Sequence, residues 1–199
     1  MPSVQLPATP RTRLSTASVV DAAIELVDQQ GRGALTLAAV AKRTGVATPS
    51  LYKHVRSLES LRQKVSARAT GELAHVLSTA VAGRSGQEAL RWVAHAYRDY
   101  ALAHPGRYSM TQHVPDAQDP EHLAAGEQAV NAMVAALRGY GLDGDDAIDA
   151  TRVTRSALHG FVSLQVDDGF GLPQDVGRSF ERLISALHVS LSNWDQVAR

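Results

Sequence analysis

The strongest constraint on the fold of this chain comes from residues 36–55, which read TLAAVAKRTGVATPSLYKHV. This stretch predicts two short helices joined by a tight turn. The first helix covers residues 37–44, and the hydroxyl of Thr36 is placed to cap its first turn. Gly45 follows where the helix must end, in the position that favours a left-handed backbone. A helix this short needs a partner, so the second half of the stretch decides what the unit is.

The second helix of the pair carries SLYKHV, residues 50–55. We expect Thr48 to be its N-cap and Pro49 to take its first position, where a missing N–H costs nothing. Two short helices around a glycine turn form a helix-turn-helix, whose second helix enters the major groove of DNA. A preceding helix is predicted over residues 16–30, where apolar residues repeat with helical spacing. The three helices together predict a compact unit.

The distribution of charge separates this unit from the rest of the chain. Residues 1–70 hold ten Lys or Arg and four Asp or Glu, whereas residues 71–199 hold ten Arg and sixteen acids. No acid lies between Asp28 and Glu59, and the helix-turn-helix falls within that gap. A basic module on an acidic body suits a polyanionic partner, although small charge clusters are also common on solvated faces.

The remainder of the chain continues the helical pattern, and no segment alternates convincingly with a period of two. Ser57 is expected to cap a long helix that ends near Gly83, with Gly71 as a weak point inside it. Further helices are predicted over residues 87–104, 121–140, 143–166 and 174–194, with a proline-bounded segment at 105–120. The buried face of the helix at 143–166 is expected to include Val153, Ala157, Phe161 and Leu164.

These patterns predict an all-α protein in three parts. A flexible N-terminal arm, residues 1–14, contains three prolines and few apolar residues. The helix-turn-helix domain occupies residues 15–68 and a second helical domain residues 69–199. The helix that opens at Ser57 joins the two domains.

Several classes of site are not indicated by the sequence. The chain has no cysteine, which excludes disulfides, thiolate metal sites and cysteine nucleophiles. The histidines show no metal-binding spacing, and no catalytic motif or phosphate-binding loop is present, so we expect no metal, no cofactor and no catalytic residues. There is no signal peptide and no apolar run long enough to span a membrane, so a cytoplasmic location is expected.

Residues 15–68 resemble the DNA-binding domain of the TetR-like (tetracycline-repressor-like, TetR/AcrR) transcriptional regulators. The resemblance is carried by VVDAAIELVDQQG, then LTLAAVAKRTGV, then TPSLYKHVRSLESL. It implies a C-terminal ligand-binding and dimerisation domain over residues 69–199, with the last two helices of each subunit forming the dimer interface. Leu158-His159-Gly160 also resembles the Trp-His-Gly signature of one subgroup, with leucine in place of tryptophan.

The resemblance also implies which residues face DNA. Hydroxyl and ring N–H groups are suited to fix phosphates, while the start of the second helix is placed to read base edges. Nearby cations would add non-specific attraction to the backbone. The expected DNA-binding residues are Thr36, Lys42, Arg43, Thr48, Pro49, Ser50, Tyr52, Lys53, His54 and Arg56.

An effector site in the second domain needs apolar walls with a few polar groups. Most aromatic and histidine residues there could equally be ordinary core. Because few charges line the predicted faces, an apolar or aromatic small molecule is the favoured effector. The candidate ligand-binding residues are Trp92, Tyr97, Tyr100, Met110, His113, Met133, His159 and Phe161.

The sequence therefore favours a homodimeric, sequence-specific repressor that binds a near-palindromic operator in double-stranded DNA and is released by a small molecule. Two alternatives stay open at this point. One is a helical-bundle enzyme or cofactor carrier whose N-terminal module contacts proteins. The other keeps DNA binding but makes the protein an activator of the same fold.

Overall fold

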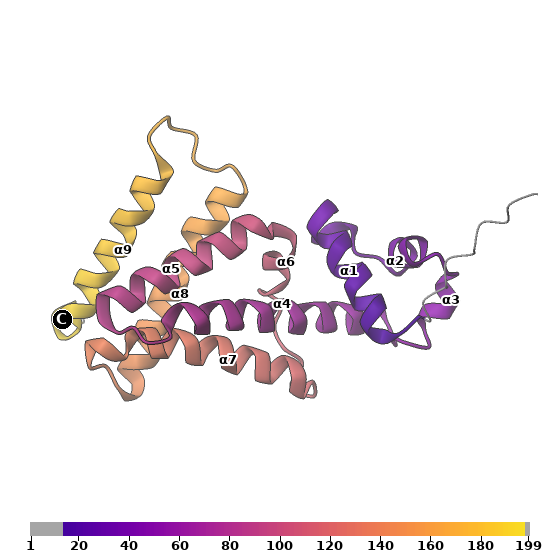
Figure 1. Cartoon of the computed structure of the whole chain (residues 1–199), viewed down its shortest axis with the longest axis horizontal. Coiled ribbons are helices and arrows are strands. Elements are labelled where there is room, and N and C mark those ends of the chain that lie inside the picture. Colours follow the sequence, from indigo (N-terminus) through magenta and orange to yellow (C-terminus); the bar gives the residue numbers. More distant parts are fainter. Residues whose placement is uncertain (1–13, 198–199) are drawn as a thin grey trace, which may run out of the picture.

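The computed structural model describes residues 14–197, and every regular element within them is helical, as expected for an all-α protein. The predicted N-terminal arm, residues 1–14, lies outside the described residues except for Leu14. Figure 1 shows an elongated molecule in which one long helix runs from a small head into a larger body. The helices of the head are α1 (Thr16–Gln30), α2 (Leu37–Thr44) and α3 (Thr48–Leu51), and the long helix is α4 (Leu58–Val81).

The body contains the remaining helices, packed around the second half of α4. In Figure 1, α7 runs along one side of α4 and α5 along the other. The helix α8 packs against α5 and α7, and α9 packs against α5 and α8. These helices are α5 (Gly86–Ala103), α6 (Pro105–Met110), α7 (Pro120–Leu137), α8 (Gly144–Val166), α9 (Val176–Ser192) and α10 (Trp194–Val197), with short 3-10 turns at Arg32–Ala34 and Arg138–Tyr140.

The helix boundaries follow local capping signals closely. The side chains of Ser15, Thr36 and Ser57 each accept a hydrogen bond from a backbone N–H in the first turn of α1, α2 and α4. Those bonds satisfy donors that the helix itself leaves unpaired. The segment at 105–120 is partly helical, because Pro105 starts α6 and a loop follows Met110.

Two separate apolar cores hold the head and the body. The head core is mostly aliphatic and joins α1, α2, α3 and the first half of α4. Met110 of α6 also belongs to it, with 5% of its surface exposed. From Leu73 onward, the buried apolar residues of α4 belong to the body core, which also includes Tyr97, Tyr108 and Phe180. The helix α4 therefore contributes to both cores.

Gly71 does not interrupt α4, and the stability cost that the sequence predicts for this interior glycine stays a prediction. The helix is continuous from Leu58 to Val81. A Cβ placed on Gly71 would meet only the Cβ of Ala125 in α7, at 3.9 Å. That distance is an ordinary van der Waals contact, so the glycine is not required by the packing.

The predicted buried face of α8 was wrong. The structure buries Ala150, Thr154, Leu158 and Val162, together with Thr151, and turns a second apolar stripe outward. Val153 is 45% exposed and Leu164 is 52% exposed, while Ala157 and Phe161 are partly buried. The helix carries apolar residues on two faces, and spacing alone does not tell which face meets the core.

Candidate nucleic-acid interface and effector cavity

The turn between α2 and α3 has the geometry that the sequence predicts. Thr36 Oγ1 accepts a hydrogen bond from the N–H of Ala39 at 3.1 Å. Gly45 adopts φ +69°, a left-handed conformation that glycine reaches without steric cost. The N–H of Val46 then donates to the carbonyl of Ala41 at 3.0 Å, which closes the end of α2. The turn is thus fixed by its own backbone.

The start of α3 differs from the prediction by one residue. Ala47 is the N-cap, Thr48 is already the first helical residue, and no side chain caps the helix. Proline is tolerated throughout the first turn because those N–H groups have no partner within the helix, so its presence did not fix the boundary. The helix also ends early, at Leu51, and residues 52–54 form a hydrogen-bonded turn rather than more α-helix.

In α3 and the turn after it, two residues are buried in the head core and the others are exposed or partly exposed. Leu51 and Val55 are 0% and 2% exposed and fix the segment to the head core. Tyr52 is 56% exposed although it lies next to Leu51. Pro49 and Lys53 are also exposed, while the expected contacts Thr48, Ser50 and His54 are partly exposed. The residues expected to recognise DNA in α3 and the turn after it are therefore at least partly accessible.

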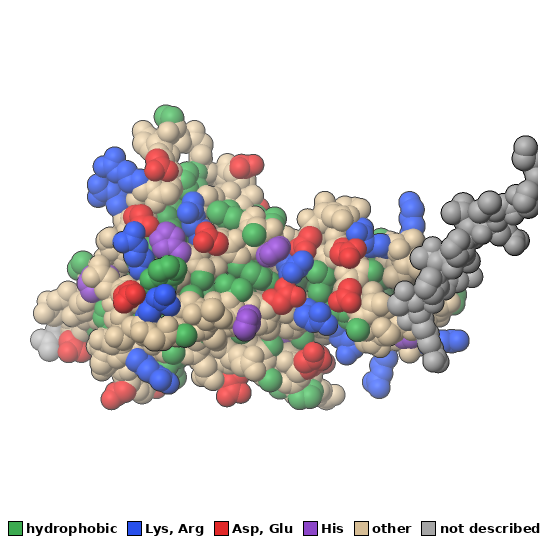
Figure 2. All heavy atoms as spheres, in the orientation of Figure 1, with side chains coloured by type: hydrophobic (Ala, Val, Ile, Leu, Met, Phe, Trp, Pro, Cys, Tyr) green, Lys and Arg blue, Asp and Glu red, His purple; other side chains and the backbone are tan. Residues whose placement is uncertain are grey.

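The flanking cations are not equivalent. Lys42 and Arg56 are exposed with no ion pair among the residues that the structure describes. Arg43 instead donates to Glu25 Oε2 from Nε at 3.0 Å and from Nη2 at 2.7 Å, and to Gln29 Oε1 at 2.9 Å. Its charge is already paired within the head, so we assign Arg43 to holding α2 against α1 rather than to phosphate attraction. Figure 2 shows basic side chains projecting from the edges of the head.

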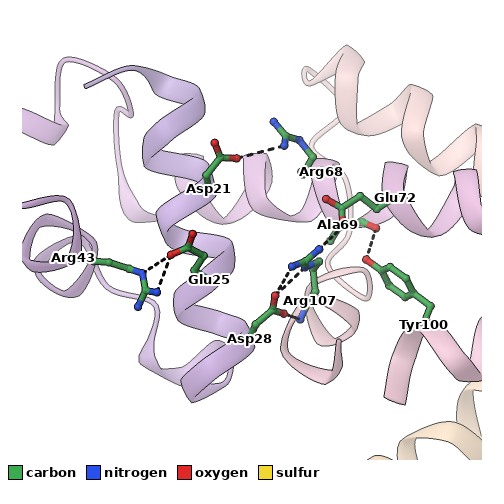
Figure 3. Close-up of polar contacts among 9 residues, drawn as sticks. All are labelled: Asp21, Glu25, Asp28, Arg43, Arg68, Ala69, Glu72, Tyr100 and Arg107. Carbon is green, nitrogen blue, oxygen red and sulfur yellow. Dashed lines mark hydrogen bonds and ion pairs between the residues drawn. The ribbon is translucent and has the colours of Figure 1, made fainter. Parts of the chain in front are cut away.

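The head meets the body through α6, in the contact drawn in Figure 3. Arg107 donates to both carboxylate oxygens of Asp28 in α1 and to Glu72 Oε2 in α4 at 2.8 Å. Burial lowers the pKa of Arg107, but these hydrogen bonds outweigh it and raise the pKa above its ordinary value. Beside it, a Cβ on Gly106 would lie 1.9 Å from the carbonyl oxygen of Val27. We call this set of contacts the α6 junction.

The body contains a cavity of about 320 Å³ beside the second half of α4. Of the predicted ligand-binding residues, it brings together Tyr97, His113 and Met133. The remaining lining residues come from α4, the loop after α6, α7 and α8. They are Thr70, Leu73, Leu77, Thr111, Gln112, Val114, Pro115, His122, Gly126, Ala129, Val130, Thr151 and Arg155.

The other five candidates do not line this cavity. Trp92 is 50% exposed and lies under the guanidinium of Arg84, 4.4 Å from its ring centroid. Met110 is buried in the head core. The hydroxyl of Tyr100 donates to the carbonyl of Ala69, and His159 contacts the hydroxyl of Tyr108. The ring of Phe161 packs against two phenylalanine rings. These three are structural residues here, because their polar or aromatic groups already have partners.

A buried polar chain lies next to the cavity. The hydroxyl of Tyr97 is 3.0 Å from that of Tyr108, which is 2.6 Å from His159 Nδ1. Burial raises the pKa of both tyrosines, so both stay neutral and hydrogen-bonded at physiological pH. Burial, with the nearby charge of Arg155, lowers the pKa of His159.

Sequence reasoning missed His122, which is 1% exposed. Its Nε2 is 3.0 Å from Ser66 Oγ and its Nδ1 is 2.9 Å from Gln63 Oε1, so it joins α7 to α4. Burial lowers its pKa. The only signal in the sequence was its position one turn into a helix after Asp119, which caps α7. That signal does not distinguish a buried histidine from an exposed one.

The geometry of the head agrees with comparisons to known proteins. The family model described as "Bacterial regulatory proteins, tetR family" matches residues 19–65, and the model described as "Tetracyclin repressor-like, C-terminal domain" matches residues 90–187. The HTH-type transcriptional regulator Rv0681 of Mycobacterium tuberculosis is 43% identical over 77% of this chain and 71% of its own length. This chain belongs to the tetR family of bacterial regulatory proteins.

Other similarities are consistent with membership of the tetR family. The HTH-type transcriptional regulator YobS of Bacillus subtilis is 34% identical over 84% of this chain and 87% of its own length. A solved structure of BioQ with its double-stranded DNA operator has a TM-score of 0.66, with 22% identity over 91% of this chain and 99% of that chain. At that identity the likeness shows the fold. The chain is thus a DNA-binding transcriptional regulator with a helix-turn-helix head. No helix in residues 14–197 is long and apolar enough to cross a membrane.

Proposed function

We propose that this tetR family regulator is a homodimeric repressor that leaves its operator when a small molecule fills the cavity of the body. One observation carries the DNA contact: Tyr52 and Lys53 are exposed beside two fully anchored residues, Leu51 and Val55. A rigid segment with an outward aromatic hydroxyl and an ammonium group is suited to a phosphate backbone and the edge of a groove. The protein would act by binding DNA and a ligand, without catalysing a reaction, and would do so in the cytoplasm, where the DNA that it regulates lies.

The DNA-contacting set that we propose is smaller than the sequence suggested. Its exposed members are Thr36, Pro49, Tyr52 and Lys53, and its partly exposed members are Thr48, Ser50 and His54. Lys42 and Arg56 supply non-specific attraction, whereas Arg43 is withdrawn from the set because Glu25 and Gln29 hold it. The absence of any acid between Asp28 and Glu59 keeps this surface free of repulsion toward phosphate.

The outward stripe of α8 supports the dimer. Val153 and Leu164 are each close to half exposed on one face of α8, and Val189 of α9 is 60% exposed. Apolar area on the two helices that form one wall of the body suits a self-complementary interface. In such a dimer the two heads would contact successive major grooves, about 34–36 Å apart on a near-palindromic operator.

The position of the cavity supports release by a ligand. Thr70, Leu73 and Leu77 form part of its wall, and all three lie on α4, whose first half is packed into the head. A ligand that prefers a different position of α4 would shift the dimer toward a spacing that no longer fits the operator. An activator of the same fold would use the same contacts but bind DNA more tightly with its ligand.

A mobility-shift titration with operator DNA at graded salt tests the DNA contact. Tyr52→Ala and Lys53→Ala are each expected to weaken operator binding about tenfold or more, and the wild-type affinity should fall steeply with salt. Arg138→Ala, which removes a charge from the body, is the matched control and should bind like the wild type. Equal affinity for all four proteins would remove the assignment. Size measurement of each variant checks that the dimer is intact.

A further inference from the structure

The cavity of the body has an apolar wall and a charge of one sign. Its apolar surface comes from Leu73, Leu77, Val130 and Met133, with the ring of Tyr97. No Asp or Glu is among its lining residues, and Arg155 is the only lining residue with a permanent charge. A mostly apolar cavity with one fixed cation in its wall can hold an apolar ligand that also carries a polar or anionic group.

Arg155 has no anionic partner among the described residues. Its one hydrogen bond there is from Nη2 to Gln112 Oε1, at 3.4 Å, and no carboxylate lies within 4.0 Å of it. Seven other described arginines have an acid beside them, whereas Arg32, Arg56, Arg98, Arg138, Arg178 and Arg182, like Arg155, have no ion pair within residues 14–197. The seven paired arginines are Arg43, Arg62, Arg68, Arg84, Arg91, Arg107 and Arg152.

The two histidines that line the cavity are already engaged. His122 contacts Ser66 and Gln63, and His113 Nε2 is 2.9 Å from Glu59 Oε1. Both ring nitrogens of His122 are therefore used, whereas His113 uses only Nε2, in a contact with a carboxylate. Arg155 remains the one permanently charged group in the wall with bonding capacity to spare, because a guanidinium carries five N–H donors.

A second polar group in the wall also lacks a partner. Thr70 is 7% exposed, and its Oγ1 is buried with no hydrogen-bond partner within residues 14–197. A buried hydroxyl without a partner is destabilising, and most such groups in proteins are satisfied. Thr70 lies on α4 and Arg155 on α8, so a buried hydroxyl without a partner and an exposed guanidinium without an acid line the cavity from different helices.

We infer that the effector of this regulator is a small hydrophobic anion, an organic acid with an apolar chain or single ring. Arg155 would pair with the acid group, for which its forked donors are matched, and Thr70 would donate to an acceptor on the ligand. The apolar body would contact Leu73, Leu77 and Met133. This inference rests on the proposed function, because it names the ligand class of the same cavity.

The charge of the cavity wall distinguishes between ligand classes. Its volume of about 320 Å³ is at the lower end of the range for small-molecule sites, which suits a small ligand. A cationic ligand would meet Arg155 with no acid in the wall to compensate. A neutral alcohol of equal length would fill the same apolar surface and leave the guanidinium unpaired.

Isothermal titration calorimetry of the full-length protein with octanoate, 1-octanol and octylamine tests the ligand class, since the three probes share one chain length and differ in charge. Octanoate is expected to bind saturably, 1-octanol at least tenfold more weakly, and octylamine not at all. Equal or tighter binding of 1-octanol or octylamine, or no binding of octanoate, would overturn the inference.

Variants test the two residues. Arg155→Gln is expected to weaken octanoate at least tenfold without changing 1-octanol, and Thr70→Val to weaken octanoate about threefold with no loss of thermal stability. Arg138→Gln removes an equal charge from the body outside the cavity and should bind octanoate like the wild type. If Arg155→Gln, folded by circular dichroism, kept the wild-type octanoate affinity, Arg155 would not be the anion-binding group and the inference would fail.

The same proteins separate this inference from the proposed function. Operator binding that octanoate releases in the wild type but not in Arg155→Gln supports both. Operator binding without any octanoate affinity overturns the ligand class and leaves the repressor assignment in place. Octanoate binding that depends on Arg155, in a protein with no operator affinity, supports the ligand class and removes the proposed function.

Discussion

The head carries its polar side chains on the outside of an aliphatic core, whereas the body buries polar side chains between its helices. The buried polar residues of the described chain, Ser66, Thr70, His122, Thr151 and Thr154, all lie on α4 from Ser66 onward, on α7 or on α8. In the head, Tyr52 and Lys53 are exposed and their neighbours Leu51 and Val55 are fully buried. The polar groups available for binding therefore lie on the surface of the head, and in the body several polar groups lie between the helices.

This difference determines how each region responds to mutation. A substitution on the surface of the head removes a contact with DNA and leaves the core as it was. A substitution of a buried residue in the body can alter packing and hydrogen bonding between several helices. The α6 junction links the two regions, so it provides the most severe test of whether they behave as one unit.

Gly106→Ala is expected to have the largest effect on stability. Its Cβ would lie 1.9 Å from Val27 O and 2.4 Å from the carbonyl carbon, and these are backbone atoms that cannot turn aside. We expect a loss of about 3 kcal/mol in the free energy of unfolding, measured by urea titration. Gly126→Ala in α7, where no atom lies within 4 Å, is the control and should be neutral or slightly stabilising. A wild-type midpoint for Gly106→Ala would show that α6 does not hold the head.

Arg107→Gln should rank second, and Arg43→Gln gives a matched comparison inside the head. Arg107 and Asp28 have side chains only 22% and 21% exposed, so removing the guanidinium leaves two carboxylates without their partner. We expect a loss of about 2 kcal/mol. Arg43 pairs with Glu25, whose side chain is 61% exposed, and its loss should cost under about 1 kcal/mol. Equal losses from chemical denaturation would mean that the junction is no stronger than a surface pair.

Two histidines of the body, the buried His122 and the partly buried His159, predict a dependence of stability on pH. Burial lowers the pKa of His122 and His159 below the ordinary value of 6.5 in the folded state. Their neutral forms therefore favour folding above pH 6.5, and this contribution is lost as the pH falls through the lowered folded pKa. We expect the melting temperature to drop between pH 7 and pH 5, and to drop less in a His122→Asn, His159→Asn double variant. A double variant with the full wild-type slope would contradict the prediction.

Gly71→Ala should have the smallest effect, and in the opposite direction. The glycine lies inside α4 with room for a methyl group, and alanine loses less backbone entropy on folding. A gain of about 0.5–1 kcal/mol is expected from thermal denaturation. Because Gly71 lies where α4 passes from the head to the body, the same variant reports on whether flexibility there matters. Unchanged stability with weaker release by ligand would indicate that the glycine serves motion.

The head could be predicted from the sequence because its signals are local. Ser15, Thr36 and Ser57 cap the helices they precede, and Gly45 takes the left-handed conformation expected of it. Each of these interactions spans three or four residues. The error at Thr48 has the same origin, because a helix start next to a proline is defined only to within one position.

The cavity could not be predicted because its parts come from distant segments. Thr70 and Arg155 belong to helices that meet only in the folded body, and neither lies in a recognisable motif. The sequence favoured aromatic residues for this site instead. Of these, Trp92 lies on the surface, whereas Tyr100 and Phe161 pack in the body core. The wrong face of α8 has a related cause, since one apolar stripe packs on the core and the other is left exposed.

The sharing of α4 between both cores has a geometric consequence. Twelve residues separate Thr70 in the cavity wall from Leu58 at the start of the helix, which is about 18 Å along a continuous helix. A tilt of about 5° at Thr70 would therefore move the head about 1.5 Å sideways. In a symmetric dimer, the distance between the two heads would change by about 3 Å. Hydrogen bonds to DNA are lost over less than that distance. In the proposed mechanism, the length of α4 would convert a small tilt at the cavity into a larger displacement of each head.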